Sequence, residues 1–251
     1  MTSPAFFAYL VRLGDDRLVL GHRLSEWCGH GPILEEDIAL ANVSLDLIGH
    51  ATLLLKLAGE TEGKGRNEDA LAYFRDGTDY RNALMTELPK GDFGFTIVRQ
   101  LLFSVFSLLQ MEALQRSSSF DLAGIAAKAV KETRYHVRHS AQWVITLGDG
   151  TSDSHARAQA AVDALWRYTG ELFITDAVEQ EATADGFGVD ASTLANPWRA
   201  QIDDVLSRAT LVVPTAEYMQ RGGRDGRHTE HLGHMLSDMQ IVARSHPGAT
   251  W

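Results

Sequence analysis

Long runs without proline, in which apolar residues recur at helical spacing, most constrain how this chain can fold. Between Leu34 and Leu55 the apolar residues recur at steps of three, four and seven, which predicts a helix that ends near Leu57 and Gly59. About 25 residues at 1.5 Å each give roughly 37 Å, the length of a rod in a helical bundle. Residues 93–115 are apolar on nearly every side, which indicates a central helix covered all round.

Most of the remaining chain also follows helical patterns. Helices are predicted over 15–28, 121–147 with Asp121 as the N-cap, 154–181, 197–209 and 229–243. Strand patterns are nearly absent outside short pieces such as 211–213. Residues 59–68, 148–153 and 182–197 look like loops, and none is long enough for an interdomain linker. The sequence therefore predicts an all-α fold, with residues 1–251 in a single domain.

Composition excludes several classes of protein. The chain has 23 Lys and Arg against 33 Asp and Glu, a net charge of −10, which disfavours binding to nucleic acid or to anionic lipid. Four basic residues cluster, and we interpret them as a solvated helix face rather than a phosphate site: Lys128, Lys131, Arg134 and Arg138. Without an apolar run of about 18 residues or a secretory signal pattern, we expect no membrane span and a cytoplasmic location.

The single cysteine, Cys28, excludes an intrachain disulfide and a Cys-rich metal site. We expect it to be a small buried thiol rather than a nucleophile. His228, His231 and His234 are spaced like metal ligands, but three-residue steps spread them over about 120° of a helix, so we expect exposed residues. The stretch 222–228, GGRDGRH, is either a surface turn or a loop that binds a phosphate or a partner's carboxylate.

Acidic residues on otherwise apolar helices are the candidate functional residues: Glu26, Asp46, Glu112 and Glu132. The first two are 20 residues apart, and so are the last two, which suggests two similar helical hairpins. Four-helix bundles that hold two metal ions take one acid from each of two helices and a Glu-x-x-His from each of the other two. The four acids match that layout.

The histidines that such a site needs are missing from the expected positions, because Gly49 and Tyr135 stand three residues after Asp46 and Glu132. We therefore expect vestigial positions with no metal and no catalytic residue. His50 and His136 stand four residues after the acids and leave a displaced metal site open as an alternative. The default interpretation is buried acid–histidine or acid–lysine pairs that hold the helices in register. Lys128 or a retained proton would neutralise Glu112.

Three stretches resemble the C subunits of bacterial ring-1,2-phenylacetyl-CoA epoxidases, the monooxygenases of aerobic phenylacetate catabolism. They are GDDRLVLGHRLSEWCGHGPILEEDIALANVSLDLIGHATLLL (14–55), KETRYHVRHSAQWVITLGDGT (131–151) and GGRDGRHTEHLGHML (222–236). The resemblance implies a ferritin-like four-helix bundle with additional helices. It also implies a stable complex with a catalytic di-iron A subunit, and a B subunit that links such pairs. A separate reductase subunit with FAD and an iron–sulfur cluster would supply electrons from NADPH.

In that family the C subunit is regarded as a structural partner without its own iron ligands, so the first hypothesis is a non-catalytic scaffold for the epoxidase. The second is a self-sufficient di-metal oxygenase or a metal-binding bundle, with ligands drawn from Asp46, His50, Glu112, Glu132 and His136. A third is a homodimeric helical adaptor unrelated to oxygenases. A homo-oligomer of the chain alone is open under each hypothesis.

Overall fold

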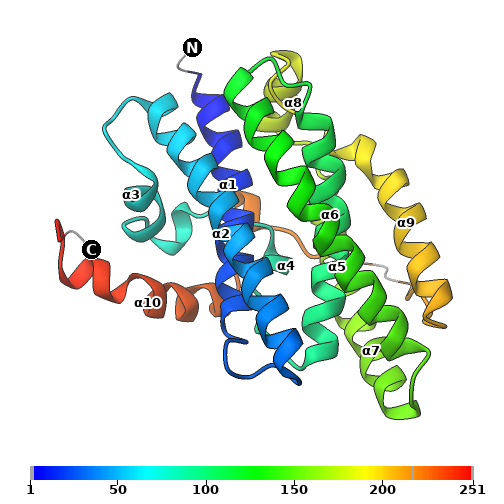
Figure 1. Cartoon of the computed structure of the whole chain (residues 1–251). Coiled ribbons are helices and arrows are strands. Elements are labelled where there is room, and N and C mark those ends of the chain that lie inside the picture. The colour runs from blue at the N-terminus through cyan, green and yellow to red at the C-terminus, as the bar shows by residue number, and fades with distance from the viewer. Residues whose placement is uncertain (1–2, 216–217, 250–251) are drawn as a thin grey trace.

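The computed structural model describes residues 3–215 and 218–249, and its helices form an elongated bundle (Figure 1). Within these ranges the chain forms ten α-helices and no β-strand, which confirms the predicted all-α class. The helices are α1 Pro4–Ser25, α2 Leu34–Glu62, α3 Glu68–Tyr73, α4 Leu84–Glu87, α5 Phe93–Leu114, α6 Phe120–Gly148, α7 Ser152–Trp166, α8 Ala177–Ala184, α9 Ala195–Arg208 and α10 Glu230–Ser245.

Two long antiparallel hairpins form the centre of the molecule, as the equal spacing of the acids suggested. Helix α1 packs along α2, α5 packs along α6, and α2 also contacts α6. The first hairpin is close-packed at Gly21, where a Cβ atom would lie 2.9 Å from Cγ1 of Ile48. The hydroxyl of Ser44 donates to the carbonyl of Gly21 at 2.7 Å. This hydrogen bond fixes the position of the two helices relative to each other along their axes.

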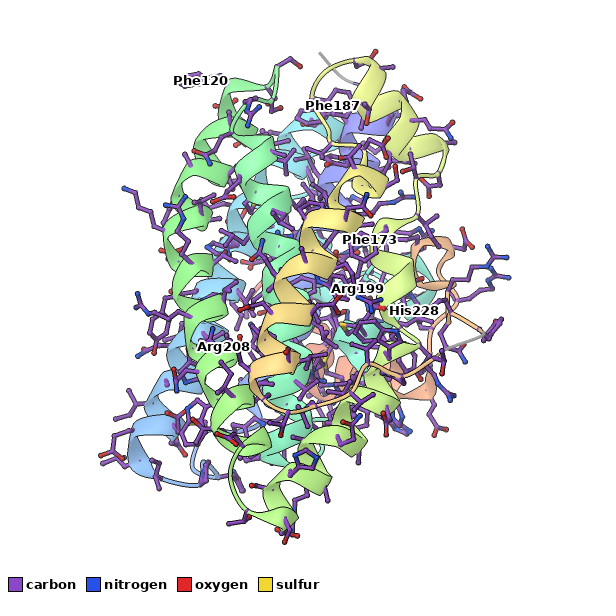
Figure 2. The ribbon with its side chains drawn as sticks, turned by 90° about the vertical axis from the view of Figure 1, so that its right-hand side faces the viewer. Phe120, Phe173, Phe187, Arg199, Arg208 and His228 are labelled. Atoms are coloured by element: carbon purple, nitrogen blue, oxygen red, sulfur yellow. The ribbon has the colours of Figure 1, made fainter. Side chains whose placement is uncertain are left out.

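The shorter helices cover only part of this bundle. Helices α7 and α9 pack on α5 and α6, α4 and α8 pack on α1, and α10 packs on α3. In the second view α2 and α6 run along one edge of the molecule, and no other helix of residues 3–215 and 218–249 lies outside them (Figure 2). The opposite side carries the segment around His228 (Figure 2).

The first helix starts eleven residues before the predicted start at Asp15, so that prediction was wrong. Ser3 is the N-cap and accepts a hydrogen bond from the Phe6 amide at 3.3 Å, and Pro4 follows at the first helical position. Asp15 and Asp16 resemble a helix start in the sequence, but both are fully buried in the middle of α1. Similarly, Ser119 rather than Asp121 caps α6.

The predicted long helix over 154–181 was also wrong. Helix α7 ends at Trp166, a 3₁₀ turn covers Thr169–Phe173, and α8 starts separately. The carboxylate of Asp176 is the N-cap of α8, because its Oδ1 accepts from the Val178 amide at 3.0 Å. The short helices α3 and α4 were not predicted from the sequence, because neither is long enough for a full amphipathic repeat.

Two hydrophobic clusters fill the bundle, one toward each end. On α1, residues up to Val19 belong to one cluster and residues from Leu20 onward belong to the other. The same division falls between Leu47 and Ala51 on α2, and between Phe106 and Met111 on α5. The core is therefore interrupted near its midpoint, where polar side chains lie.

Helices α2 and α5 are long and apolar enough to cross a membrane, judged by length and composition alone. In α5, 78% of the most apolar window is buried within the molecule, as expected for the central helix of a bundle. In α2 only 50% of that window is buried. Part of the apolar surface of α2 is therefore left uncovered by this chain.

Glu179 on α8 makes the stability of the fold depend on pH. Burial raises the pKa of Glu179 from its ordinary value to about 7, and its Oε2 atom has no hydrogen-bond partner. Because the unfolded chain releases this proton near pH 4.5, folding loses stability as the pH rises from there through 7.

We expect Glu179→Gln to gain stability relative to the parent chain by about 3 kcal/mol between pH 4.5 and pH 8. Urea unfolding followed by circular dichroism at both pH values measures this change. Glu181→Gln, at an exposed position on the same helix, is the matched control. A pH-independent difference for Glu179→Gln would contradict the assignment.

Candidate functional site

A layer of buried polar side chains separates the two hydrophobic clusters. We define the polar layer by Arg17 on α1, His50 on α2, Ser107 and Gln110 on α5, and His136 on α6. Each of these residues is at most 4% exposed to solvent. Each of the four long helices contributes to the layer, just as facing helices contribute the ligands of metal sites in the cores of four-helix bundles.

Acid–histidine pairs join α2 to α6 across this layer. His50 Nε2 lies 2.5 Å from Glu132 Oε2, and His136 Nε2 lies 3.0 Å from Asp46 Oδ2. The two pairs are reciprocal, since each helix supplies one acid and one histidine. These are pairs of the kind that the default interpretation of the sequence expected, and they fix the register of two antiparallel helices.

A third pair extends the same line toward the start of α2. His139 Nε2 lies 2.8 Å from Glu36 Oε2, and the glutamate is buried. Glu36 was not among the predicted candidates, because it lies in the acidic first turn of α2, where carboxylates are common for reasons of helix dipole alone. The sequence signal that could have identified Glu36 is its spacing of ten residues from Asp46.

The helix register places the histidines inside and the expected ligand positions outside. Gly49 is exposed, and Tyr135 is 38% exposed. A histidine at either position would therefore point away from the bundle. The buried residues three positions before His50 and His136 are Leu47 and Thr133, neither of which carries a carboxylate.

Asp46 and Glu132 lie at the edges of the polar layer, each with 32% of its side chain exposed. Glu26 lies further along, at the C-cap of α1, where it accepts from Arg23 at 2.6 Å. Since Ser44 is level with Gly21 and the two helices are antiparallel, Asp46 is level with Val19, and Glu26 stands seven residues beyond that level, or roughly 10.5 Å along the axis. The structure therefore keeps Glu26 apart from Asp46.

Glu112 is not an interior acid, contrary to the expectation from its helix face. Its side chain is 38% exposed and accepts a hydrogen bond from Arg134 at 2.8 Å. Arg134, rather than Lys128, is therefore the basic side chain that pairs with it. Of the four candidate acids, the structure brings only Asp46 and Glu132 to the polar layer.

This donor set does not fit a carboxylate-bridged pair of metal ions. Each of the four acids already faces a basic side chain of this chain: Arg23, His136, Arg134 or His50. In residues 3–215 and 218–249, no three His, Cys, Asp or Glu side chains are grouped so that they could hold a metal ion. The inward residues of the polar layer supply nitrogen, hydroxyl and amide groups but no bridging carboxylate.

A fixed positive charge also occupies the polar layer. Arg17 is fully buried and donates to Ser107 Oγ at 2.9 Å, Gln110 Oε1 at 3.3 Å and the Leu13 carbonyl at 2.9 Å. Burial lowers the pKa of Arg17 to about 10. Burial, followed by the charge of Arg17, lowers the pKa of His50 to about 4, which keeps this imidazole neutral at pH 7.

The neighbouring acids on α1 belong to a separate, structural network. Asp15 binds Arg75, and its Oδ2 accepts from the Arg81 amide at 2.8 Å. Asp16 forms two hydrogen bonds with Arg224, at 2.9 and 2.8 Å, and accepts from the Ala83 amide at 2.7 Å. These contacts attach two distant segments of the chain to the middle of α1.

The stretch 222–228 is held by contacts to other segments of the same chain, and we call it the clamp. It is therefore not the phosphate loop considered from the sequence. Arg224 is committed to Asp16, and a Cβ on Gly223 would lie 2.1 Å from the Asn82 carbonyl. His228 precedes α10 and contacts Glu87 Oε2 at 2.7 Å, so it is not an exposed helix residue as expected. His234 is exposed, in agreement with the expectation, and His231 is half-buried.

Two further sequence expectations have different outcomes. Cys28 is exposed beyond the end of α1, so the prediction of a buried thiol was wrong. Its position after the last turn of α1, just before the GHGP stretch, accounts for the exposure. The basic cluster on α6 is exposed along its length, as predicted for a solvated helix face: Lys128, Lys131, Arg134 and Arg138.

Two buried arginines should respond differently to the same substitution. Arg224→Met leaves the carboxylate of Asp16 buried without its partner, and we expect a loss of about 3–5 kcal/mol in the free energy of unfolding. Arg17→Met removes a charge that has no carboxylate bonded to it, and we expect a change of only about 1 kcal/mol. Chemical denaturation of both variants at pH 7 tests the contrast, which equal losses would contradict.

Known proteins resemble this chain along nearly its whole length. A sequence profile described as "Phenylacetic acid catabolic protein", which covers the A and C types, matches residues 1–251. The chain is also similar to the C subunit of the 1,2-phenylacetyl-CoA epoxidase of Escherichia coli (strain K12). The two are 45% identical over 244 residues, which cover 97% of this chain and 98% of the relative.

Proposed function

Because the chain belongs to the phenylacetic acid catabolic protein family, whose fold is ferritin-like and all-α, we propose that it is the structural C subunit of a multicomponent phenylacetyl-CoA epoxidase. In this role it binds and stabilises a catalytic di-iron A subunit. The observation that carries the proposal is the similarity to the C subunit of an epoxidase along nearly the full length of both chains. The similarity is therefore not limited to one shared motif.

The interior of the bundle supports a role without chemistry in this subunit. A di-metal oxygenase needs carboxylates that face inward and bridge its ions, whereas Leu47 and Thr133 occupy the positions three residues before the inward histidines. The buried guanidinium of Arg17 adds a positive charge that opposes the binding of a cation nearby. We therefore propose that this chain has no catalytic residue and no metal of its own.

The remaining components of the reaction belong to other subunits in this proposal. The A subunit holds the di-iron centre, the B subunit links A and C pairs, and a reductase with FAD and an iron–sulfur cluster delivers electrons from NADPH. The chain acts in the cytoplasm as a single ferritin-like domain, residues 1–251. It binds neither nucleic acid nor membrane, and any homo-oligomer forms only when the partner is absent.

Co-expression with the A subunit of the same epoxidase tests the proposal. We expect the two chains to co-purify at a one-to-one ratio, and epoxidation of phenylacetyl-CoA by the reconstituted system to fall when this chain is left out. Failure of the chains to co-purify, with this chain alone eluting as a dimer, would instead favour the unrelated helical adaptor.

Metal analysis separates the scaffold from the alternative, a self-sufficient di-metal protein. The chain purified alone from iron-supplemented medium should contain far less than one iron per chain and show no oxo-bridge absorption. His50→Ala and His136→Ala serve as controls, since the alternative requires both imidazoles. Near-stoichiometric iron that these substitutions abolish would establish a metal site and refute the scaffold role.

A further inference from the structure

Helices α2 and α6 present a continuous face that no other helix in the described part of the chain covers (Figure 1). We call it the open face and define it by exposed residues of both helices. On α2 these are Leu34, Ile38, Asn42, Leu45, Gly49 and Thr52, and on α6 they are Lys128, Lys131, Arg134, Tyr135, Arg138 and Gln142. Each set recurs at steps of three and four, so each forms one stripe along its helix.

The stripe on α2 is apolar to a degree that is unusual for an exposed helix surface. Leu34 is 72% exposed, Ile38 53% and Leu45 66%. They lie in the helix whose most apolar window is only half buried. Apolar side chains gathered along one edge, rather than scattered singly, mark a surface that a partner covers.

The stripe on α6 is basic in a chain that is otherwise acidic. Lys128, Lys131, Arg134 and Arg138 are all exposed, and from Gly124 to Gly148 the only acidic residue is Glu132, which faces His50. One of the four, Arg134, is engaged by Glu112, and the other three have no salt bridge within 4.0 Å in the described chain. In a protein with a net charge of −10, this stripe attracts an acidic surface.

The open face is large enough to form most of a stable interface. On α2 it spans residues 34–52, which is about 28 Å of helix, and two helices 8–10 Å apart present a surface about 20 Å wide. The product, about 560 Å², is the larger part of the roughly 800 Å² that each partner buries in a protein–protein interface of standard size.

We propose that the open face is the docking surface for the A subunit, which meets it with an apolar strip over α2 and an acidic strip over α6. This inference rests on the proposed function and adds which surface of the chain contacts the A subunit. Charge selects this occupant over a second copy of the chain. In a homodimer with a twofold axis at this face, the basic stripe of one copy would face either the basic stripe or the α2 stripe of the other. Between Leu34 and Thr52 the α2 helix has a single exposed acid, Glu35, so neither arrangement pairs the basic side chains with acidic ones.

Single charges placed in the apolar stripe test the proposal. We expect Ile38→Glu and Leu45→Glu each to weaken binding of the A subunit by about 30-fold or more in Kd, as for central interface residues. The matched control is Ile241→Glu on α10, where the same side chain is 61% exposed away from the open face. Titration calorimetry with purified A subunit measures Kd, and circular dichroism checks that each variant is folded.

Charge reversal tests the basic stripe separately. The double variant Lys131→Glu, Arg138→Glu should slow association with the A subunit by at least about tenfold at low salt, and the difference should shrink as salt is added. If the parent chain binds the A subunit and the α2 and α6 variants bind equally well, the docking surface is elsewhere while the proposed function stands. If the parent chain fails to bind, the proposed function itself fails.

Light scattering of the chain alone tests whether a second copy of the chain binds the open face. We expect a monomer, or an oligomer that Ile38→Glu leaves intact. A homodimer that Ile38→Glu and Leu45→Glu dissociate, but Ile241→Glu does not, would assign the open face to a second copy and overturn the proposal.

Discussion

Three consecutive charged residues in the middle of a buried helix set the arrangement of the rest of the chain. Successive side chains on a helix are about 100° apart, so Asp15, Asp16 and Arg17 point in three directions, and all three are fully buried. Each buried charge needs partners. Asp15 recruits Arg75, Asp16 recruits Arg224, and Arg17 reaches two side chains of α5. The helix thus acts as an axis to which distant segments are attached.

The same layer shows how a bundle can retain the shape of a metal-binding fold without its chemistry. Two histidines face inward from α2 and α6, but they bind acids from the edges of the layer rather than an ion. A difference of one residue in register decides this, because Asp46 and Glu132 lie four positions before the inward histidines instead of three. The pairs hold the two helices in register, and the face outside them remains free for assembly.

The sequence predicted the framework of the fold well, because the long amphipathic helices α2, α5 and α6 follow from apolar spacing alone. It failed for α1 and α7, where charged residues that are paired inside the protein resembled helix starts and where Asp176 begins a new helix. The sequence identified the candidate acids, but it did not predict the directions in which their side chains point. Partners such as Arg134 and Glu36 come from other helices, and sequence spacing does not specify which neighbouring side chain is within reach.

The contact between Asp16 and Arg224 also has a consequence for synthesis, since 208 residues separate the two partners. At 5–20 residues per second, a ribosome needs roughly 10 to 40 s to make the intervening chain. During that time the carboxylate of Asp16 lacks its arginine partner, and burying it in the bundle would leave an unpaired charge. Truncated products lack this ion pair altogether, so the middle of α1 gains its full set of partners only in polypeptides translated almost to the end.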